Sequence, residues 1–113
     1  MRIPLRVTFR NVDHSPALES RIRELAGRLD RFSDQIVGCH VVVEAPHRHQ
    51  HQGRLYEVRI ELSVPESEIA IRRTHPSSHS HEDPYVALRD AFQAARRKLQ
   101  DYERRRYKKV RTH

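Results

Sequence analysis

The sequence predicts an α+β fold, a two-layer sandwich in which two helices cover one face of a four-stranded sheet in the order β-α-β-β-β-α. Three observations predict it. Four segments have the apolar–polar alternation or the β-branched content of strands, and two longer segments carry apolar residues with the period of a helix. Both helical segments begin with a capping residue followed by proline. At 113 residues the chain has the length of one ordinary domain, so we expect residues 1–113 to form a single domain.

The first strand and the first helix are predicted within residues 2–32. Residues 2–10 alternate, with apolar side chains at positions 3, 5, 7 and 9, as in a half-buried strand. Ser15 and Pro16 then predict a helix start, because a serine hydroxyl caps free amides and proline suits the first helical position. The apolar residues that follow are three or four residues apart and form one buried face. They are Leu18, Ile22, Leu25, Leu29 and Phe32.

Three further strands are predicted between residues 36 and 73. Residues 36–44 are rich in β-branched side chains, and residues 56–64 alternate again, with polar positions that should face solvent. A short turn at residues 65–67 joins this strand to a fourth over residues 68–73, which pairs with it as a hairpin. On the buried face of the first of these strands we expect Val37, Cys39, Val41 and Val43.

The second helix is predicted to begin at Asp83 and Pro84, again a capping residue followed by a first-turn proline. A second apolar stripe runs along this helix, and basic residues with the same helical spacing lie beside and opposite the stripe. Residues 108–113 are expected to form a basic tail. The stripe consists of Tyr85, Leu88, Phe92, Ala95, Leu99 and Tyr102.

The positive charge of the chain is concentrated in this C-terminal segment. The formal net charge is +7, and residues 89–113 contain ten basic and three acidic side chains, whereas the rest of the chain contains twelve of each. A concentrated positive strip attracts polyanions, because their condensed counterions are released on binding. Basic residues that keep phase with an apolar core face therefore favour a nucleic-acid surface over a merely solvated helix.

The first helix carries a smaller basic flank. At about 100° per residue, Arg21, Arg28 and Arg31 fall to one side of its apolar stripe. When both helices cover the same face of a sheet, this flank can lie beside the basic flank of the second helix. The two flanks would then form one surface.

Other classes of protein find no support in the sequence. Gly27, Gly38 and Gly53 are not clustered, so neither a P-loop nor a dinucleotide fingerprint is present. No spacing distinguishes a catalytic triad from chance, and a fold this small offers little cleft, so we expect no enzyme, no cofactor and no small-molecule substrate. Cys39 is the single cysteine and no long apolar segment occurs, which predicts a cytoplasmic protein without an intrachain disulfide or a membrane partner.

The histidines form two groups, within residues 46–54 and 74–82. In the first group His47, His49 and His51 alternate, and histidines at i and i+2 of an extended segment can chelate a transition metal. Carboxylate or thiolate partners do not recur beside them, so the sequence favours solvated loops over a metal site. Contact with RNA is the other role that these imidazoles could have.

Two stretches of the chain resemble a known family. They are Phe9-Arg10-Asn11-Val12 with Ser15-Pro16-Ala17-Leu18, and the helix opening Asp83-Pro84-Tyr85-Val86-Ala87-Leu88. Both resemble the ribosome hibernation promoting factors and ribosome-associated inhibitors, also called sigma-54 modulation proteins, over roughly residues 2–107. The chain departs from the family pattern at position 89, where the motif has an acidic residue and this chain has Arg89; the acidic residue comes one position later, as Asp90. The chain resembles the short members of the family, which lack a dimerisation domain.

The resemblance implies a fold similar to a double-stranded RNA-binding domain. It also implies binding to the small ribosomal subunit, in the channel of messenger and transfer RNA, so that translation stops under stress or in stationary phase. Self-association is left open. Two alternatives remain, a general double-stranded RNA or DNA binder and a metal-binding regulator built on the histidine groups. The candidate rRNA-binding residues are Arg21, Arg28, Arg31, Arg89, Arg96, Arg97, Arg104, Arg105, Lys108 and Lys109.

Overall fold

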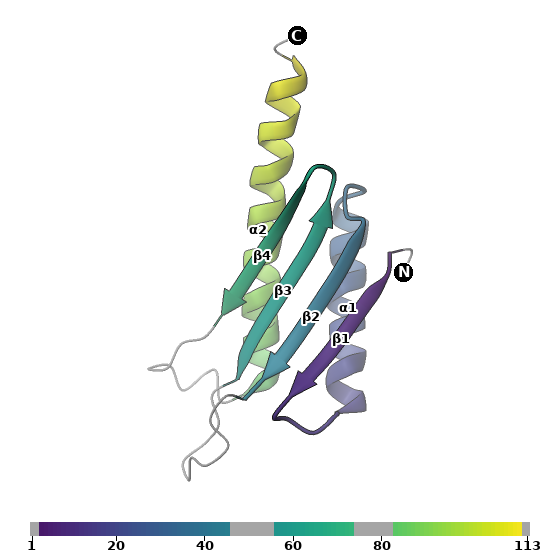
Figure 1. Cartoon of the computed structure of the whole chain (residues 1–113), viewed down its shortest axis with the longest axis vertical. Coiled ribbons are helices and arrows are strands. Elements are labelled where there is room, and N and C mark those ends of the chain that lie inside the picture. Colours follow the sequence, from purple (N-terminus) through teal and green to yellow (C-terminus); the bar gives the residue numbers. More distant parts are fainter. Residues whose placement is uncertain (1–2, 46–55, 74–82, 112–113) are drawn as a thin grey trace.

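The computed structural model describes residues 3–45, 56–73 and 83–111 and confirms the predicted fold class and element order. Within these residues the chain forms four strands and two helices (Figure 1). In chain order they are β1 (Leu5–Arg10), α1 (Pro16–Phe32), β2 (Gly38–Glu44), β3 (Glu57–Val64), β4 (Ser67–Arg73) and α2 (Pro84–Arg111).

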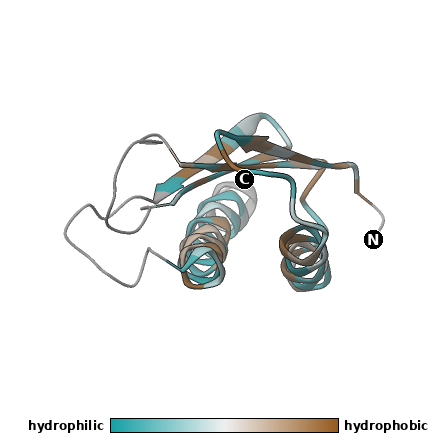
Figure 2. Ribbon diagram, turned by 90° about the horizontal axis from the view of Figure 1, so that it is seen from below, coloured by the Kyte–Doolittle hydropathy of each residue, from teal (hydrophilic) through white to brown (hydrophobic). Residues whose placement is uncertain are grey.

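The strands form one sheet in the order β1-β2-β3-β4. Strand β1 pairs with β2 in parallel, and the other neighbours pair antiparallel. Helix α1 connects the two parallel strands, which need a crossover of this kind because a tight turn cannot join them. Both helices lie against one face of the sheet, and no described element covers the other face (Figure 2).

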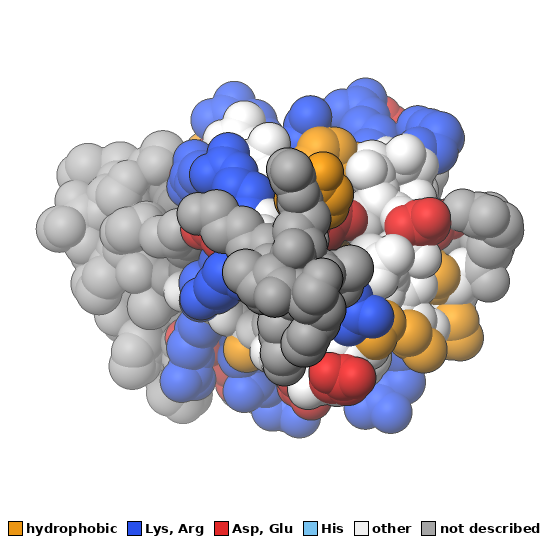
Figure 3. All heavy atoms as spheres, turned by 90° about the horizontal axis from the view of Figure 1, so that it is seen from above, with side chains coloured by type: hydrophobic (Ala, Val, Ile, Leu, Met, Phe, Trp, Pro, Cys, Tyr) orange, Lys and Arg blue, Asp and Glu red, His pale blue; other side chains and the backbone are white. Residues whose placement is uncertain are grey.

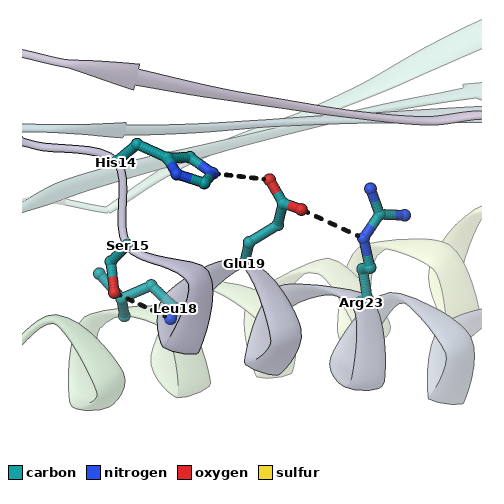
Figure 4. A network of polar contacts seen from close by, with 5 residues as sticks. All are labelled: His14, Ser15, Leu18, Glu19 and Arg23. Carbon is teal, nitrogen blue, oxygen red and sulfur yellow. Dashed lines mark hydrogen bonds and ion pairs between the residues drawn. The ribbon is translucent and has the colours of Figure 1, made fainter.

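Each helix begins with the predicted cap. The Ser15 hydroxyl accepts a hydrogen bond from the Leu18 amide at 3.2 Å (Figure 4). Pro16 occupies the first turn. Glu19 lies one turn into the helix. Its Oε1 atom is 3.0 Å from the His14 ring, and its other carboxylate oxygen is 3.6 Å from Arg23. The hydrogen bond with His14 lowers the pKa of Glu19 below its ordinary value. The side chain of Asp83 accepts from the Tyr85 amide at 2.9 Å and caps α2 in the same way.

The hydrophobic core lies between the sheet and the helices. Both predicted stripes are largely buried there, together with alternate residues of the strands. The largest fully buried side chains are Ile22, Val41, Val43, Val58, Ile60, Leu62, Leu88 and Leu99, with Val42 on the opposite face of β2. Removal of this apolar surface from water is the main force that holds the helices on the sheet.

Two apolar residues that we assigned to the core are exposed. Val37 is 60% exposed, because it lies ahead of β2 and the alternation is interrupted at Gly38, so that Ile36 is buried in its place. Tyr85 is 43% exposed in the first turn of α2. The expectations for these two residues were therefore wrong, whereas Cys39, Val41 and Val43 are buried as predicted.

The polar face of β3 is also less exposed than the alternation predicted. Glu57 is only 7% exposed, although it lies on the sheet face that the helices leave uncovered. Its carboxylate accepts a hydrogen bond from Arg72 Nε of β4 at 2.6 Å, and this bond raises the pKa of Arg72. The pairing satisfies a carboxylate that would otherwise be costly to bury.

Helix α2 is longer than the strands and extends beyond the sheet at its C-terminal end (Figure 1). It continues to Arg111 and therefore enters the segment in which we expected a basic tail. Near this end the hydroxyl of Tyr102 donates to the Pro65 carbonyl at 2.8 Å, and Arg106 Nη1 donates to the Tyr102 oxygen at 3.1 Å. These bonds fix the turn between β3 and β4 on α2.

That turn holds Glu66 in the left-handed region, with a φ of 65°. We expect Glu66→Gly to stabilise the protein by about 0.5–1 kcal/mol. Glycine adopts this conformation without the steric cost that a side chain adds. This gain in free energy is larger than the loss caused by the greater conformational freedom of glycine in the unfolded chain. Urea unfolding followed by circular dichroism measures the change. Glu68→Gly in β4 is the matched control and should destabilise the protein; a loss of stability with both variants would contradict the prediction.

Candidate nucleic-acid interface

A groove of about 290 Å³ runs between α1 and α2. Its floor is apolar and its walls carry four of the arginines that the sequence singled out. These groove arginines are Arg21 and Arg28 from α1 and Arg89 and Arg96 from α2. The rest of the lining consists of Leu25, Leu29, Phe32, Phe92 and Gln93.

Helical spacing explains why these arginines meet. Both helices begin at the same end of the sheet (Figure 1), and in each helix the first groove arginine lies in the second turn. The second follows seven residues later, which is two turns and returns the side chain to nearly the same flank. Because the two helices pack beside each other, their basic flanks face one another across the groove.

Local contacts hold the groove arginines in place. Arg21 Nη1 and Arg28 Nη2 both donate to Glu24 Oε1, each at 2.7 Å. Arg89 Nη2 lies 3.7 Å from Asp90 Oδ1. The guanidinium carbon of Arg96 lies 4.4 Å from the centre of the Phe32 ring, a cation–π contact. Exposed ion pairs of this kind are weak, so a polyanion can compete for the same guanidinium groups.

A further hydrogen bond fixes the spacing of the helices. The buried hydroxyl of Ser33, directly after α1, donates to the carboxylate of Glu103 in α2. The Ser33 hydroxyl oxygen also accepts a hydrogen bond from the Gln35 amide at 3.2 Å. The C-terminal end of α1 is therefore attached to the C-terminal third of α2, which helps to hold the two helices side by side.

The other candidate residues lie elsewhere. Arg31 lines a separate hollow of about 660 Å³ on the β1 side of α1, together with Arg23 and Asp30. Arg97 is exposed and does not line the groove. Arg104 is exposed, 3.7 Å from Asp101, and Arg105 lies on the side of α2 that faces β4. Lys108 and Lys109 belong to α2, but their side chains lie outside the described part of the chain.

Sequence reasoning missed the contribution of three uncharged residues. Phe32 and Phe92 belong to the apolar stripes and were assigned to the core, yet both line the groove. Gln93 was not considered at all, although it lies between Arg89 and Arg96 in steps of four and three residues. That spacing is the signal that could have placed it on the same flank.

The uncovered face of the sheet differs from the helix layer in its charge. The strand register places arginines and glutamates on it in equal number. In a view onto the end from which α2 projects, lysine and arginine side chains lie around the edge of the molecule, with a few acidic side chains among them (Figure 3). The residues on the sheet face are Arg6, Arg10, Arg59 and Arg72 with Glu44, Glu57, Glu61 and Glu68.

His40 lies among these charges, with its Nε2 atom 2.9 Å from the Thr8 hydroxyl. Burial, chiefly, lowers its pKa below the ordinary value, so it adds no charge near pH 7. Burial also raises the pKa of the Cys39 thiol to about 12, which keeps it protonated and unreactive, as expected for a small core residue.

The two histidine groups lie outside the described residues. Among the residues that are described, no group of three histidine, cysteine or acidic side chains could hold a metal ion. Within the same residues no helix has a stretch that is long and apolar enough to cross a bilayer.

Comparison with known proteins identifies the family. The model of the sigma 54 modulation protein / S30EA ribosomal protein family matches residues 5–107. A ribosomal subunit interface protein from Coxiella burnetii is similar in structure, with a TM-score of 0.70 at 19% identity over 89% of this chain and 98% of that chain. The N-terminal domain of Protein Y from Thermus thermophilus gives a TM-score of 0.66 at 18% identity over 90% and 99%. No curated protein sequence matches. The chain therefore belongs to the sigma 54 modulation protein / S30EA ribosomal protein family.

Proposed function

We propose that this protein is a ribosome-associated translation inhibitor that binds the small ribosomal subunit in the channel of messenger and transfer RNA. The observation that carries the proposal is the groove between α1 and α2, where four arginines converge in a chain that belongs to a ribosomal protein family. The proposed role is that of a hibernation factor, which acts when growth stops under stress or in stationary phase.

Binding would rest on phosphate contacts. The planar guanidinium group donates two parallel hydrogen bonds to a phosphate, and each contact releases condensed counterions from the RNA. The groove arginines supply the centre of this surface, and the exposed Arg97 and Arg104 extend it along α2. The helix layer then faces the RNA, and the sheet faces away from it.

Inhibition would follow from occupation alone. An A-form RNA helix has a major groove too narrow for side chains, so a helix pair contacts RNA through its shape and its phosphates. The folded sheet behind the helices fills the channel further, so that messenger and transfer RNA cannot enter it while the protein is bound. No bond is made or broken in this scheme.

The test is a sedimentation assay of the wild-type protein with 30S subunits, 50S subunits and a naked RNA duplex. We expect comigration with 30S subunits, displacement of bound transfer RNA, and an affinity that falls about 100-fold between roughly 50 and 200 mM salt if about four phosphates are neutralised. Equal affinity for the naked duplex would instead support a general double-stranded RNA or DNA binder. Absence of comigration at the lower salt would refute the proposal.

A further inference from the structure

The groove between α1 and α2 has a feature that phosphate binding does not require. Between the arginine walls its floor consists of two leucines and two phenylalanines. Guanidinium groups at a surface are sufficient to bind a phosphate, and apolar atoms beneath them add nothing to its affinity. A ligand that fits this groove carries negative charge at its edges and a flat apolar face at its centre, as a nucleotide does.

Arg96 is positioned to stack on such a face. Phe32 covers one side of its guanidinium plane at 4.4 Å, and the side chain lines the groove and is exposed. The opposite side of the plane is therefore available. Unstacked RNA bases are commonly held on guanidinium planes and aromatic rings, so Phe32 and Arg96 form the first two layers of a stack that a base would complete.

The remaining lining suits the edges of a nucleotide. The Gln93 amide offers two hydrogen-bond donors and an acceptor, so it can form hydrogen bonds with the edge of a base. Arg21 and Arg28 share a single oxygen of Glu24, so their other N–H groups can donate to flanking phosphates. A volume of about 290 Å³ admits one ring system and its sugar, whereas a duplex would only contact the rim.

We propose that this groove binds one unpaired nucleotide of an RNA strand, with its base stacked on the guanidinium plane of Arg96 above the apolar floor and its phosphates on the N–H edges of the groove arginines. The inference rests on the proposed function in one respect, namely that RNA is the partner. It adds that a base, and not only the backbone, enters the protein.

The test compares two single-stranded RNA hexamers with equal charge, an adenosine hexamer and a hexamer of abasic nucleotides. We expect the wild-type protein to bind the adenosine hexamer about tenfold more tightly, because stacking of one base contributes about that much to affinity. Arg96→Lys keeps the charge but removes the planar group. It should reduce this ratio to about one, because the lysine ammonium still meets a phosphate but offers no plane on which a base can stack.

The matched control is Arg6→Lys, an exposed residue on the uncovered face of the sheet that should leave the tenfold ratio intact. Urea unfolding confirms that both variants are folded. If Arg96→Lys and Arg6→Lys give the same ratio as the wild type, or if the wild type binds both hexamers equally, the base does not enter the groove. Binding of free adenosine monophosphate as tightly as the hexamer would overturn the assignment to an RNA strand.

The outcome is separable from that of the proposed function. Comigration with 30S subunits together with equal affinity for both hexamers would leave the ribosomal role standing and refute base recognition. A tenfold ratio without comigration would do the reverse.

Discussion

Replacing Arg89 and Arg96 together by glutamate should lower the affinity for 30S subunits by at least about 100-fold. Both side chains line the groove, and each is expected to make charge-assisted hydrogen bonds that contribute about 1.5–3 kcal/mol. Reversal also places two carboxylates beside the phosphates that remain bound to α1. The slope of log affinity against log salt should become shallower by about two, one unit for each lost phosphate contact.

The control for this variant is a double reversal of Arg6 and Arg10. These residues are exposed on β1 and point to the sheet face that the helices do not cover. The change in net charge is identical, so a binding surface made by overall charge alone would be weakened equally by both variants. We expect the control to bind 30S subunits within about threefold of the wild type, because exposed charges beyond a Debye length are largely screened. Equal losses of affinity for 30S subunits with both variants would contradict the assignment of the helix layer as the RNA-binding surface.

The second large effect concerns stability. Leu99→Ala should lower the free energy of unfolding by about 2–5 kcal/mol, because Leu99 is fully buried between α2 and the sheet and its removal leaves a cavity. This loss is a large fraction of the net stability of a domain of this size. Urea titration followed by circular dichroism at 222 nm measures it.

Val37→Ala is the matched control for the core substitution. Val37 belongs to an apolar run that predicts a buried strand, yet its side chain is exposed, so its truncation should change stability by less than about 0.5 kcal/mol. A loss of several kcal/mol at Val37, or a change below 1 kcal/mol at Leu99, would mean that the core lies elsewhere than described.

Local chemistry explains why so much of the fold could be predicted. The capping residues Ser15 and Asp83 are each followed by proline, and both accept the amide hydrogen bonds that define a helix start. Alternation then fixed which face of each strand is buried. It could not locate where β2 begins, since Gly38 interrupts the pattern, nor could it show that Arg72 would cross from β4 to cover Glu57.

The candidate site was predictable within each helix but not between them. Residues seven apart share a flank, which correctly grouped Arg21 with Arg28 and Arg89 with Arg96. Arg31 is three residues beyond Arg28, a rotation of about 60° from the same flank, and it lines the hollow beside β1 instead. The pairing of flanks across the groove depends on how the helices pack, which no local pattern records.

The most direct measurement is an electron cryo-microscopy map of the protein bound to the 30S subunit. It should show α1 and α2 facing ribosomal RNA in the channel of messenger and transfer RNA, with Arg21, Arg28, Arg89 and Arg96 in contact with phosphates. A map in which the uncovered face of the sheet contacts the RNA and the helices face solvent would contradict the account.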